Sequence, residues 1–263
     1  MENQIFSVKG KVIIITGGQG LLGREFAHHL NEQGAKVAIF DIVNYENTRL
    51  DAKFISDNYL VMHVDVTNKK SIQDGLSQVE LKWGVPHGLI NCAAIDFPPD
   101  RDSHRFEDYP EEQWDKVMEV NVKGTFLCCQ VIGATMMEQH GGSIINIGSI
   151  YGMVSPDQRI YEIKEDPFIK PISYSVSKSA ILNLTRYLAT YWGKWNVRVN
   201  TMTFGGVLNN QNTKFYKNYI NKVPLERMAS KDEYNGAIQF LLSDASSYMT
   251  GANLVIDGGW TAW

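Results

Sequence analysis

Short apolar runs rich in β-branched residues alternate along the chain with longer segments whose apolar residues recur every three or four positions. The runs have the length and composition of strands that are buried on both faces of a parallel sheet. They lie at 11–16, 36–41, 60–65, 88–92, 143–148, 197–202 and 253–257. The helical pattern places Leu22, Phe26 and Leu30 on one stripe and returns at about 68–83, 111–138, 173–192 and 231–243. This alternation predicts an α/β fold, a doubly wound parallel sheet with helices on both faces.

The whole chain, residues 1–263, is predicted to form a single domain. An α/β fold of this length is commonly one domain, and no repeat, low-complexity tract or linker interrupts the pattern. Two Pro- and Asp-rich loops, at 93–111 and 151–171, follow strand ends. Because open α/β sheets bind ligands beyond the carboxyl ends of their strands, these loops are expected to border the site.

The composition argues against several classes of function. The formal net charge is −4 and no basic block is present, so nucleic acid is not an expected partner. No apolar run reaches the length of a membrane span and the first residues lack a signal-peptide pattern, which predicts a cytoplasmic protein. Cys92, Cys128 and Cys129 show neither a disulfide framework nor zinc spacing. They are interpreted as small core residues, and no metal is expected.

Tyr174 and Lys178 open a helical segment whose apolar stripe is Ala180, Leu184 and Leu188. Residues four apart lie on one helix face, so the phenol and the ammonium can point into the same pocket. A neighbouring cation lowers the pKa of a phenol, which makes the phenol usable as an acid or base near neutral pH. Such a pair is by itself more often a solvated helix face, so its interpretation depends on the rest of the chain.

A glycine turn (residues 17–23) connects the first predicted strand to the first predicted helix. Gly17, Gly20 and Gly23 occur in the strand–turn–helix context of a dinucleotide fingerprint. Glycine lets the main chain approach a pyrophosphate, whose charge the helix N-terminus favours. A plain βα turn that uses glycine to save space is the alternative.

Asp41 ends the second predicted strand, at the spacing where an acid binds the adenosine ribose hydroxyls. A carboxylate there repels the 2′-phosphate of NADP, and no cation stands at Gly18, Gln19, Ile42 or Val43 to counter it. The pattern therefore favours NAD(H) over NADP(H). The alternative role for Asp41 is that of a helix cap.

Several further motifs complete an ordered set. They are Asp65-Val66-Thr67, Asn91-Cys-Ala-Ala94, Asn121-Val-Lys-Gly124, Ser149 and Tyr174-x-x-x-Lys178. With the glycine turn and Asp41 in front of them, the chain resembles the short-chain dehydrogenase/reductase family, from about Val8 to Asp257-Gly-Gly259. The resemblance implies a Rossmann-like fold and one NAD(P)-binding domain.

The resemblance also implies roles for individual residues. Tyr174, Lys178, Ser149 and Asn121 would form the catalytic set. Ser149 would bind the substrate oxygen, and Asn121 would sit in a kinked helix and orient a relay water and Lys178. A strand-end cap and a core amide bonded to the main chain are the plainer alternatives for these two. The predicted cofactor contacts are Gly17, Gln19, Gly20, Leu22, Gly23, Asp41, Ile42, Asp65, Val66, Asn91, Ala93, Tyr174, Lys178, Gly205 and Val207.

The chain departs from the family pattern in four places, one of which is Asn91-Cys-Ala-Ala94 where the family has Asn-Asn-Ala-Gly. The turn Thr-Gly-Gly-Gln-Gly-Leu-Leu-Gly at 16–23 has the glycine spacing of the extended branch, which includes nucleotide-sugar epimerases and dehydratases. Phe204-Gly205-Gly206-Val207 stands where the family has Pro-Gly. The stretch between Ser149 and Tyr174 is much longer than usual. The extra insertion (residues 152–171) is either a solvated excursion or a substrate lid. As a lid it would contact a charged substrate through Arg159, Tyr161 or Lys164.

The prediction is an NAD(H)-dependent oxidoreductase that interconverts a secondary alcohol and a ketone on a sugar or nucleotide sugar, with Tyr174 as acid/base. The insertion and the segments 205–211 and 225–228 resemble bacterial surface-polysaccharide or flagellin-modification (nonulosonate) reductases. The alternatives are a sugar-nucleotide dehydratase or epimerase that oxidises transiently, and a non-catalytic NAD-binding sensor or scaffold. By resemblance a homotetramer or homodimer is expected, through the helices of Asn121 and Tyr174.

Overall fold

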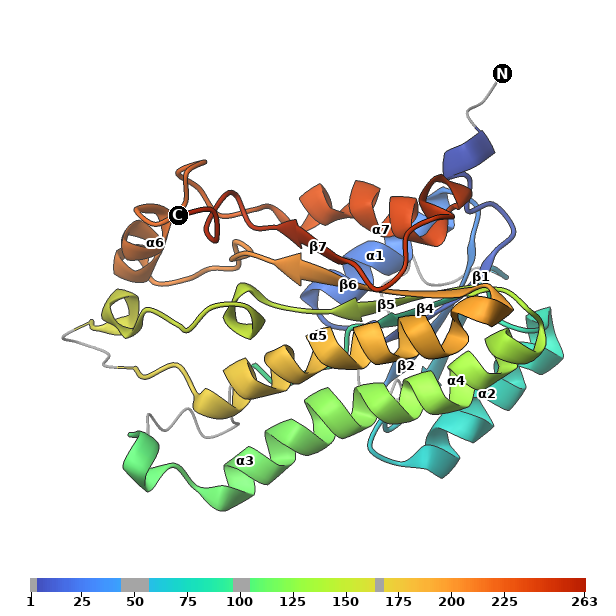
Figure 1. Cartoon of the computed structure of the whole chain (residues 1–263), viewed down its shortest axis with the longest axis horizontal. Helices are drawn as coiled ribbons and strands as arrows, with labels where there is room; N and C mark the ends of the chain where they lie inside the picture. The colour runs from blue at the N-terminus through green and yellow to red at the C-terminus, as the bar shows by residue number, and fades with distance from the viewer. Residues whose placement is uncertain (1–3, 44–56, 97–104, 164–167) are drawn as a thin grey trace.

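The computed structural model describes residues 4–43, 57–96, 105–163 and 168–263. Within these residues, seven parallel strands form one sheet in the order β3-β2-β1-β4-β5-β6-β7 (Figure 1). Their bounds are β1 Val12–Thr16, β2 Lys36–Asp41, β3 Tyr59–His63, β4 Gly88–Asn91, β5 Gly142–Ile147, β6 Val197–Phe204 and β7 Asn253–Ile256. Each predicted strand is found, and the predicted α/β class is confirmed. The strand order reverses between β1 and β4, where doubly wound sheets place their ligands.

Helices cover both faces of the sheet, as the pattern predicted (Figure 1). Helices α1 and α7 lie on one face, and α2, α4 and α5 lie on the other. The bounds are α1 Leu21–Glu32, α2 Lys69–Trp83, α3 Glu111–Met118, α4 Thr125–Glu138, α5 Ile172–Trp192, α6 Thr213–Ile220 and α7 Asn235–Leu242. No helix in the described ranges is both long and apolar enough to cross a membrane.

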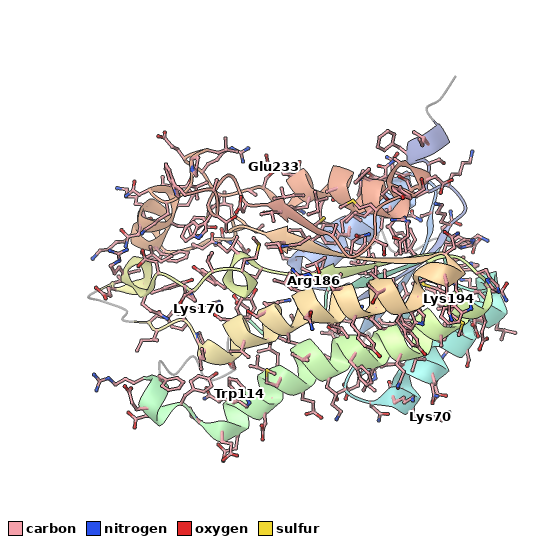
Figure 2. All side chains as sticks on the ribbon, in the orientation of Figure 1. Lys70, Trp114, Lys170, Arg186, Lys194 and Glu233 are labelled. Carbon is pink, nitrogen blue, oxygen red and sulfur yellow. The ribbon has the colours of Figure 1, made fainter. Side chains whose placement is uncertain are left out.

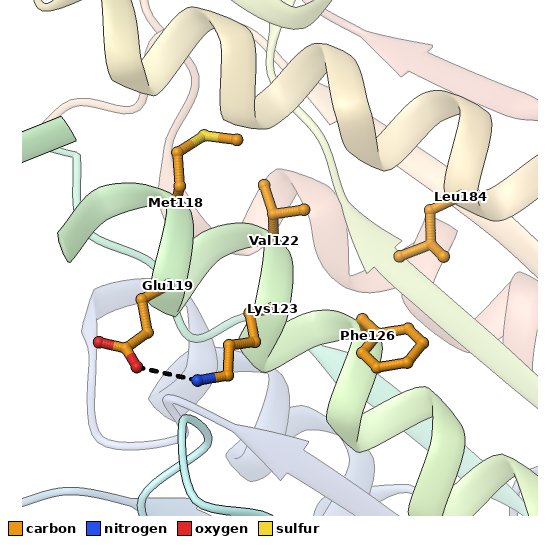
Figure 3. Close-up of a pocket in the computed structure, with 6 residues that line it drawn as sticks. All are labelled: Met118, Glu119, Val122, Lys123, Phe126 and Leu184. Atoms are coloured by element: carbon orange, nitrogen blue, oxygen red, sulfur yellow. Dashed lines mark hydrogen bonds and ion pairs between the residues drawn. The ribbon is translucent and has the colours of Figure 1, made fainter. Parts of the chain in front are cut away.

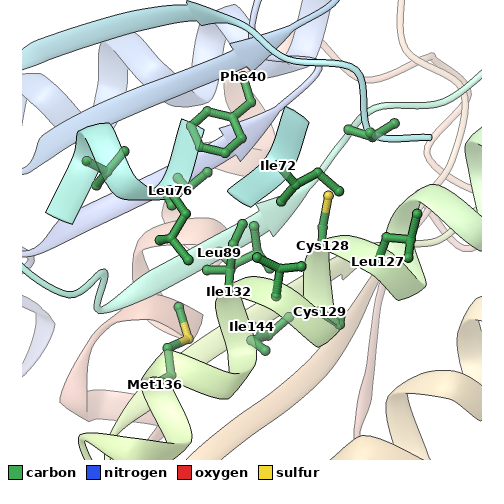
Figure 4. Close-up of a cluster of buried hydrophobic side chains, with 14 of the residues drawn as sticks. Phe40, Ile72, Leu76, Leu89, Leu127, Cys128, Cys129, Ile132, Met136 and Ile144 are labelled. Atoms are coloured by element: carbon green, nitrogen blue, oxygen red, sulfur yellow. The ribbon is translucent and has the colours of Figure 1, made fainter. Parts of the chain in front are cut away.

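The sheet is apolar on both sides because its strands alternate between two cores. On β1, Ile13 and Ile15 pack toward α1 and α7, whereas Val12 and Ile14 pack toward α2 and α4. Figure 4 shows the second core, in which Cys128 and Cys129 lie among aliphatic side chains. Burial raises the pKa of the Cys129 thiol to about 12. These two cysteines are thus inert core residues, as predicted.

Two helical segments differ from their predicted form. The segment 111–138 is α3 and α4 joined by a π-helical turn, η5 (Glu119–Gly124). The segment 231–243 is a 3-10 turn, η9 (Lys231–Tyr234), followed by α7. Helix α6 was not predicted, and it is only eight residues long. It is started by Asn212, whose side chain accepts a hydrogen bond from the Lys214 N–H at 2.8 Å.

Candidate active site

The predicted site residues gather at one edge of the sheet. The glycine turn follows β1, Asp41 ends β2, and Ser149 follows β5. Asn91 ends β4 and Gly205 follows β6. Since the strands are parallel, all these carboxyl ends meet at the same edge, where the sequence predicted the ligands to bind.

The glycine turn is packed against main chain on two sides. Gly17 has a positive φ of 63°, and a Cβ there would lie 2.7 Å from the Ala93 Cα. A Cβ on Gly23 would lie 2.3 Å from the Gly17 carbonyl oxygen. Glycine is therefore required at both positions. At its glycines the turn presents bare main chain next to the N-terminus of α1. A pyrophosphate requires such a surface, so these glycines fit a dinucleotide.

Asp41 is buried and holds the glycine turn in place. Its Oδ2 accepts a hydrogen bond from the Gln19 N–H at 2.9 Å, and its Oδ1 accepts one from the Val43 N–H at 3.1 Å. A carboxylate has about four acceptor sites, so both oxygens keep capacity for ribose hydroxyls. Ile42 beside it is exposed. This link between β2 and the turn was not visible in the sequence.

Asp65 and Val66 lie in the loop after β3. The Asp65 Oδ1 accepts hydrogen bonds from the Thr67 N–H at 2.8 Å and from the Thr67 hydroxyl at 2.7 Å. Val66 is buried, and a Cβ on Gly124 of the π-helical turn would lie 2.8 Å from its side chain. Asp65 thus shapes the loop, and Gly124 allows the turn to approach it.

Asn91 and Ala93 face different surroundings although both belong to one motif. The Asn91 amide donates to the Asn146 Oδ1 at 2.8 Å and to the Cys129 Sγ at 3.3 Å, inside the core. The Ala93 N–H donates to the Thr16 hydroxyl at 3.2 Å, next to the glycine turn. Within this motif it is therefore the main chain at Ala93, and not the Asn91 side chain, that lies beside the predicted cofactor position.

The structure brings Tyr174, Ser149 and Lys178 together. The Tyr174 phenol lies close enough to the Ser149 side chain for that hydroxyl to lower the pKa of the phenol. The Lys178 ammonium donates to the Ile147 carbonyl oxygen at 2.8 Å and lies 5.9 Å from the centre of the Tyr174 ring. Lys178 is only 5% exposed, so the pair is not a solvated helix face. The Ser149 oxygen also accepts from the Tyr151 N–H at 3.2 Å and thereby caps a 3-10 turn, η6 (Ile150–Gly152).

Asn121 clamps the loop after β4 to α5. It lies in the π-helical turn, a distortion that often marks functional sites. Its Oδ1 accepts from the Ile95 N–H at 2.7 Å, and its Nδ2 donates to the Ile95 carbonyl oxygen and to the Ser177 hydroxyl, each at 3.0 Å. The Asn121 side chain thus positions Ser177, the residue before Lys178. Its bonds to the main chain of Ile95 are those expected of a core amide, the plainer alternative for this residue.

One electrostatic expectation is wrong for the chain by itself. Burial raises the pKa of Tyr174, and the Asp96 carboxylate raises this pKa further, while the hydrogen bond with Ser149 lowers it. Burial also lowers the pKa of Lys178 to about 8. A cation near the phenol was expected to lower the pKa of Tyr174, but the loss of solvent around the phenol outweighs that effect.

The insertion does not place its predicted substrate contacts as expected. The Arg159 guanidinium is exposed and donates to both oxygens of Asp157, at 2.8 and 2.7 Å. That carboxylate also binds Lys222. Arg159 is therefore committed to an ion pair at the surface and does not face Tyr174. Tyr161 is buried, and its hydroxyl lies 2.8 Å from the Tyr151 hydroxyl. Lys164 lies outside the described residues.

An aromatic cluster packs beside Tyr174. It joins the insertion to α6 and to the C-terminal segment after β7, and its rings include Tyr151, Tyr161, Phe215, Tyr219 and Trp260. Tyr161 stacks on Phe215 with ring centres 5.2 Å apart, and Tyr219 stacks on Trp260 at 4.5 Å. The insertion is thus a packed part of the fold in its described residues.

Lys170 is a site residue that the prediction missed. Its ammonium lies 4.3 Å from the centre of the Tyr174 ring, closer than that of Lys178, and forms an ion pair with Asp96. Lys170 is 5% exposed although it belongs to the insertion. Figure 2 labels it beside the N-terminal end of α5. The available signal was its spacing, since it stands four residues before Tyr174 as Lys178 stands four after.

The segment after β6 offers a main-chain donor. A Cβ on Gly205 would lie 2.9 Å from the Asp257 Cα, so the close approach of these two loops requires glycine. The Val207 carbonyl oxygen accepts from the Gln211 side chain at 2.6 Å. Within the described ranges the Val207 N–H makes no hydrogen bond. It can therefore serve the nicotinamide amide, the contact predicted at this position.

A separate hollow lies on the outer surface of η5, α4 and α5 (Figure 3). It has a volume of about 480 Å³ and is lined by Met118, Glu119, Val122, Lys123, Phe126 and Leu184. Its walls are almost entirely apolar, apart from the ion pair between Lys123 and Glu119. No predicted catalytic residue lines it, so it is distinct from the site around Tyr174.

Comparison with known proteins agrees with this geometry. Residues 19–261 match the model of a family described as enoyl-(acyl carrier protein) reductase. The NAD-dependent glycerol dehydrogenase of Listeria innocua is 31% identical, with 97% of this chain and 96% of that protein covered. The D-arabinitol 2-dehydrogenase (ribulose-forming) of Candida tropicalis is 32% identical, with 98% and 95% covered.

A solved structure is similar over almost the whole chain. The short-chain dehydrogenase of Leptospira borgpetersenii, solved with bound NAD+, has a TM-score of 0.88 and 35% identity, with 99% of this chain and 96% of that chain covered. The chain belongs to the short-chain dehydrogenase/reductase family. It is accordingly a dehydrogenase that acts on CH–OH groups, and the predicted class of enzyme is confirmed.

Proposed function

We propose that this chain is an NAD(H)-dependent dehydrogenase that interconverts a secondary hydroxyl and a ketone on a small neutral polyol or sugar alcohol. The observation that carries the proposal is the grouping of the half-buried Tyr174 with the buried Ser149 and Lys178. This group of residues lies at the edge of the sheet that is formed by the carboxyl ends of the strands, as the glycine turn does. The two curated relatives described above act, by their names, on glycerol and on D-arabinitol, which are both vicinal polyols.

The glycine turn and Asp41 would hold the dinucleotide through main-chain N–H groups and a carboxylate. The Val207 N–H would hold its amide, and Lys178 its nicotinamide ribose. When bound, this group accepts a hydride from the carbinol carbon. The residues that hold the group and those that move the proton thus lie at the same edge of the sheet.

Tyr174 performs the proton transfer in the oxidative direction. Its phenolate takes the proton of the substrate hydroxyl, while the Ser149 hydroxyl hydrogen-bonds to the same oxygen and fixes its position. The Lys178 ammonium stabilises the phenolate, because an opposite charge nearby favours the charged form. Since burial raises the pKa of Tyr174, the site depends on Lys178 and on the bound cofactor to make the phenol reactive.

The preference for NAD(H) over NADP(H) rests on Asp41. Its buried carboxylate would repel a 2′-phosphate, and its two oxygens can accept from the ribose hydroxyls. Titration of the intrinsic Trp fluorescence with NADH and with NADPH tests this. We expect tighter binding of NADH, and a smaller difference between the two cofactors in Asp41→Ser. Equal affinities in the unchanged protein would contradict the role of Asp41.

A nucleotide sugar of surface-polysaccharide or flagellin-glycan synthesis is the more specific prediction, and the site favours it less. A charged substrate needs a cation, but Arg159 is occupied by Asp157. The relatives reported above are polyol dehydrogenases, not epimerases or dehydratases. A net oxidation that yields one NADH for each ketone formed distinguishes a dehydrogenase from an enzyme that oxidises only transiently.

A homodimer or homotetramer is proposed through the outer surface of α4 and α5. This surface carries the apolar hollow of Figure 3, together with exposed Phe126, Tyr187 and Tyr191. Apolar patches of this kind on a protein surface often mark interfaces. Light scattering coupled to gel filtration should give a multiple of the chain mass, 29.7 kDa. Phe126→Lys should reduce that mass, and a monomer for the unchanged protein would contradict the proposal.

The function itself is tested by NADH formation. The protein would be incubated with NAD and, separately, with glycerol, D-arabinitol, gluconate and a nucleotide sugar. We expect NADH absorbance to rise with at least one neutral polyol. The rise should disappear in Tyr174→Phe. Turnover of the nucleotide sugar alone would contradict the polyol assignment and restore the more specific prediction.

A further inference from the structure

The Tyr174 ring lies between two buried lysines that have different kinds of partner. Lys178 donates to a main-chain carbonyl oxygen, that of Ile147. Lys170 is paired with a side chain, the Asp96 carboxylate, which is 49% exposed. The family motif accounts for Lys178. Nothing in the mechanism above uses Lys170 or Asp96, although the Lys170 ammonium is the nearer of the two to the ring.

The insertion fixes the position of Lys170. The Lys170 N–H donates to the Gln158 Oε1 at 2.9 Å, and the Gln158 Nε2 donates to the Lys170 carbonyl oxygen at 3.1 Å. Gln158 begins the 3-10 turn η7 (Gln158–Tyr161), whose Tyr161 is anchored in the aromatic cluster. A cation held this firmly inside a protein carries a desolvation cost, so its place beside Tyr174 calls for a function.

The chemistry of the pair determines which ligand suits it. An ammonium group has three N–H donors, and a carboxylate is only an acceptor. Together the two groups have no net charge, and the partly exposed Asp96 would repel an incoming carboxylate or phosphate. A hydroxyl group matches both, because it can accept from an ammonium and donate to a carboxylate at the same time.

We propose that Lys170 and Asp96 together bind the hydroxyl on the carbon next to the one being oxidised, and so select neutral vicinal polyols over monohydric alcohols and sugar acids. This inference rests on the proposed polyol dehydrogenase function. It assigns a purpose to the insertion, which delivers Lys170 to the substrate side of Tyr174. Lys170 and Asp96 are on this account specificity-determining residues, while Tyr174 and Ser149 handle the reacting oxygen.

The expected effect is on discrimination between substrates. A hydrogen bond to a charged group is worth enough that its loss lowers kcat/KM for the substrate that makes it by about 10- to 100-fold. A monohydric alcohol makes no such bond. Replacing Lys170 should therefore reduce the ratio of kcat/KM for a polyol to kcat/KM for a monohydric alcohol by about that factor.

The experiment compares Lys170→Met with Arg159→Met, with D-arabinitol, 2-butanol and gluconate as substrates. Both variants remove a cation from the same insertion, but Arg159 lies at the surface and is paired with Asp157. We expect the arabinitol-to-butanol ratio to fall in Lys170→Met, to recover in part in Lys170→Arg, and to stay unchanged in Arg159→Met. Gluconate should be the poorest polyhydroxy substrate of the unchanged protein. NADH titration and thermal unfolding verify that each variant is folded.

Several outcomes would overturn the inference. An equal fall of kcat/KM for arabinitol and butanol, with a shifted pH profile for both, would mean that Lys170 acts on Tyr174. A fall in Arg159→Met equal to that in Lys170→Met would remove the assignment from Lys170. If Lys170→Met does not fold, Asp96→Asn serves instead, because Asp96 is partly exposed, and an unchanged ratio there overturns the proposal.

The proposed function can fail separately. An unchanged protein that oxidises D-arabinitol, with no change of ratio in Lys170→Met, keeps the function and refutes only the role of Lys170. An unchanged protein that oxidises 2-butanol but no polyol refutes both. Preference for gluconate over arabinitol refutes the neutral-polyol selection while the dehydrogenase activity stands.

Discussion

The cofactor side and the substrate side of Tyr174 are held together by different kinds of contact. On the cofactor side the contacts are made to main chain: Gly23 lies against the Gly17 carbonyl, and the Lys178 side chain binds the Ile147 carbonyl. On the substrate side, side chains bind side chains, as in the Lys170–Asp96 ion pair and the aromatic cluster around Tyr161. Main-chain contacts suit a cofactor that many enzymes share, whereas side-chain contacts can change with the substrate.

The first prediction concerns the buried Lys178 and has the largest expected effect. Its pKa of about 8 lies below the ordinary lysine value of about 10.4. Between these values the unfolded chain binds a proton that the folded protein lacks, so the unfolding free energy contributed by Lys178 rises as the pH rises from about 8 to about 10. The total change is about 3 kcal/mol.

Urea unfolding of the unchanged protein and of Lys178→Met at several pH values measures this effect. As the pH rises across that range, the unfolding free energy of the unchanged protein should increase relative to that of Lys178→Met. Lys170→Met is the matched control. Burial also lowers the pKa of Lys170, but the Asp96 carboxylate opposes this, so the control should show a weaker pH dependence. If the unfolding free energies of the unchanged protein and of Lys178→Met change in parallel with pH, then burying the Lys178 charge does not lower the stability of the protein.

The second prediction concerns the main-chain packing on the cofactor side. Gly23→Ala places a Cβ 2.3 Å from the Gly17 carbonyl oxygen, whereas Gly20→Ala places one 3.3 Å from the same atom. Overpacking of this kind costs about 1–3 kcal/mol, so Gly23→Ala should lower the unfolding free energy by that amount and weaken NADH binding more than tenfold. Gly20→Ala should have the smaller effect in thermal unfolding and in NADH titration. Equal effects would mean that the close contact does not shape the turn.

The third prediction has the smallest effect and concerns the substrate side. Tyr161→Phe removes the hydrogen bond between the Tyr161 and Tyr151 hydroxyls, which should cost about 1 kcal/mol of unfolding free energy. NADH affinity should not change, because the pair lies in the aromatic cluster and not at the glycine turn. Tyr248→Phe is the control, since Tyr248 is exposed. A loss of NADH affinity in Tyr161→Phe would show that the two sides are coupled.

The contrast between main-chain and side-chain contacts also explains which parts of the fold and the site could be predicted from the sequence. The strands, the glycine turn and the spacing of Tyr174 and Lys178 could be recognised because period and main-chain geometry constrain them locally. Ser149 and Asn121 were proposed only through the resemblance to the family. The π-helical turn at Glu119–Gly124 could not be recognised, since its apolar pattern continues that of the flanking helices. The hydrogen bond from Gln19 to Asp41 joins two strands' ends and leaves no local signature.

The substrate side was predicted poorly for the same reason. Arg159 was favoured as a substrate contact by charge alone, yet Asp157, only two residues before it, binds it at the surface. Lys170 meets Asp96 across a large separation in the chain, and nothing in either segment reveals that pairing. The aromatic cluster likewise combines η7, α6 and the C-terminal segment. Side-chain packing between distant segments is specified by the whole fold.

On the proposed function, Tyr174 moves the substrate proton and is not needed to build the cofactor site. The most direct test is Tyr174→Phe, with polyol-dependent NADH formation and NADH binding measured on the same preparation. We expect a fall in kcat of at least about a hundredfold, the contribution typical of general acid–base catalysis, with the NADH dissociation constant nearly unchanged. Retained turnover, or loss of NADH binding together with turnover, would contradict the account.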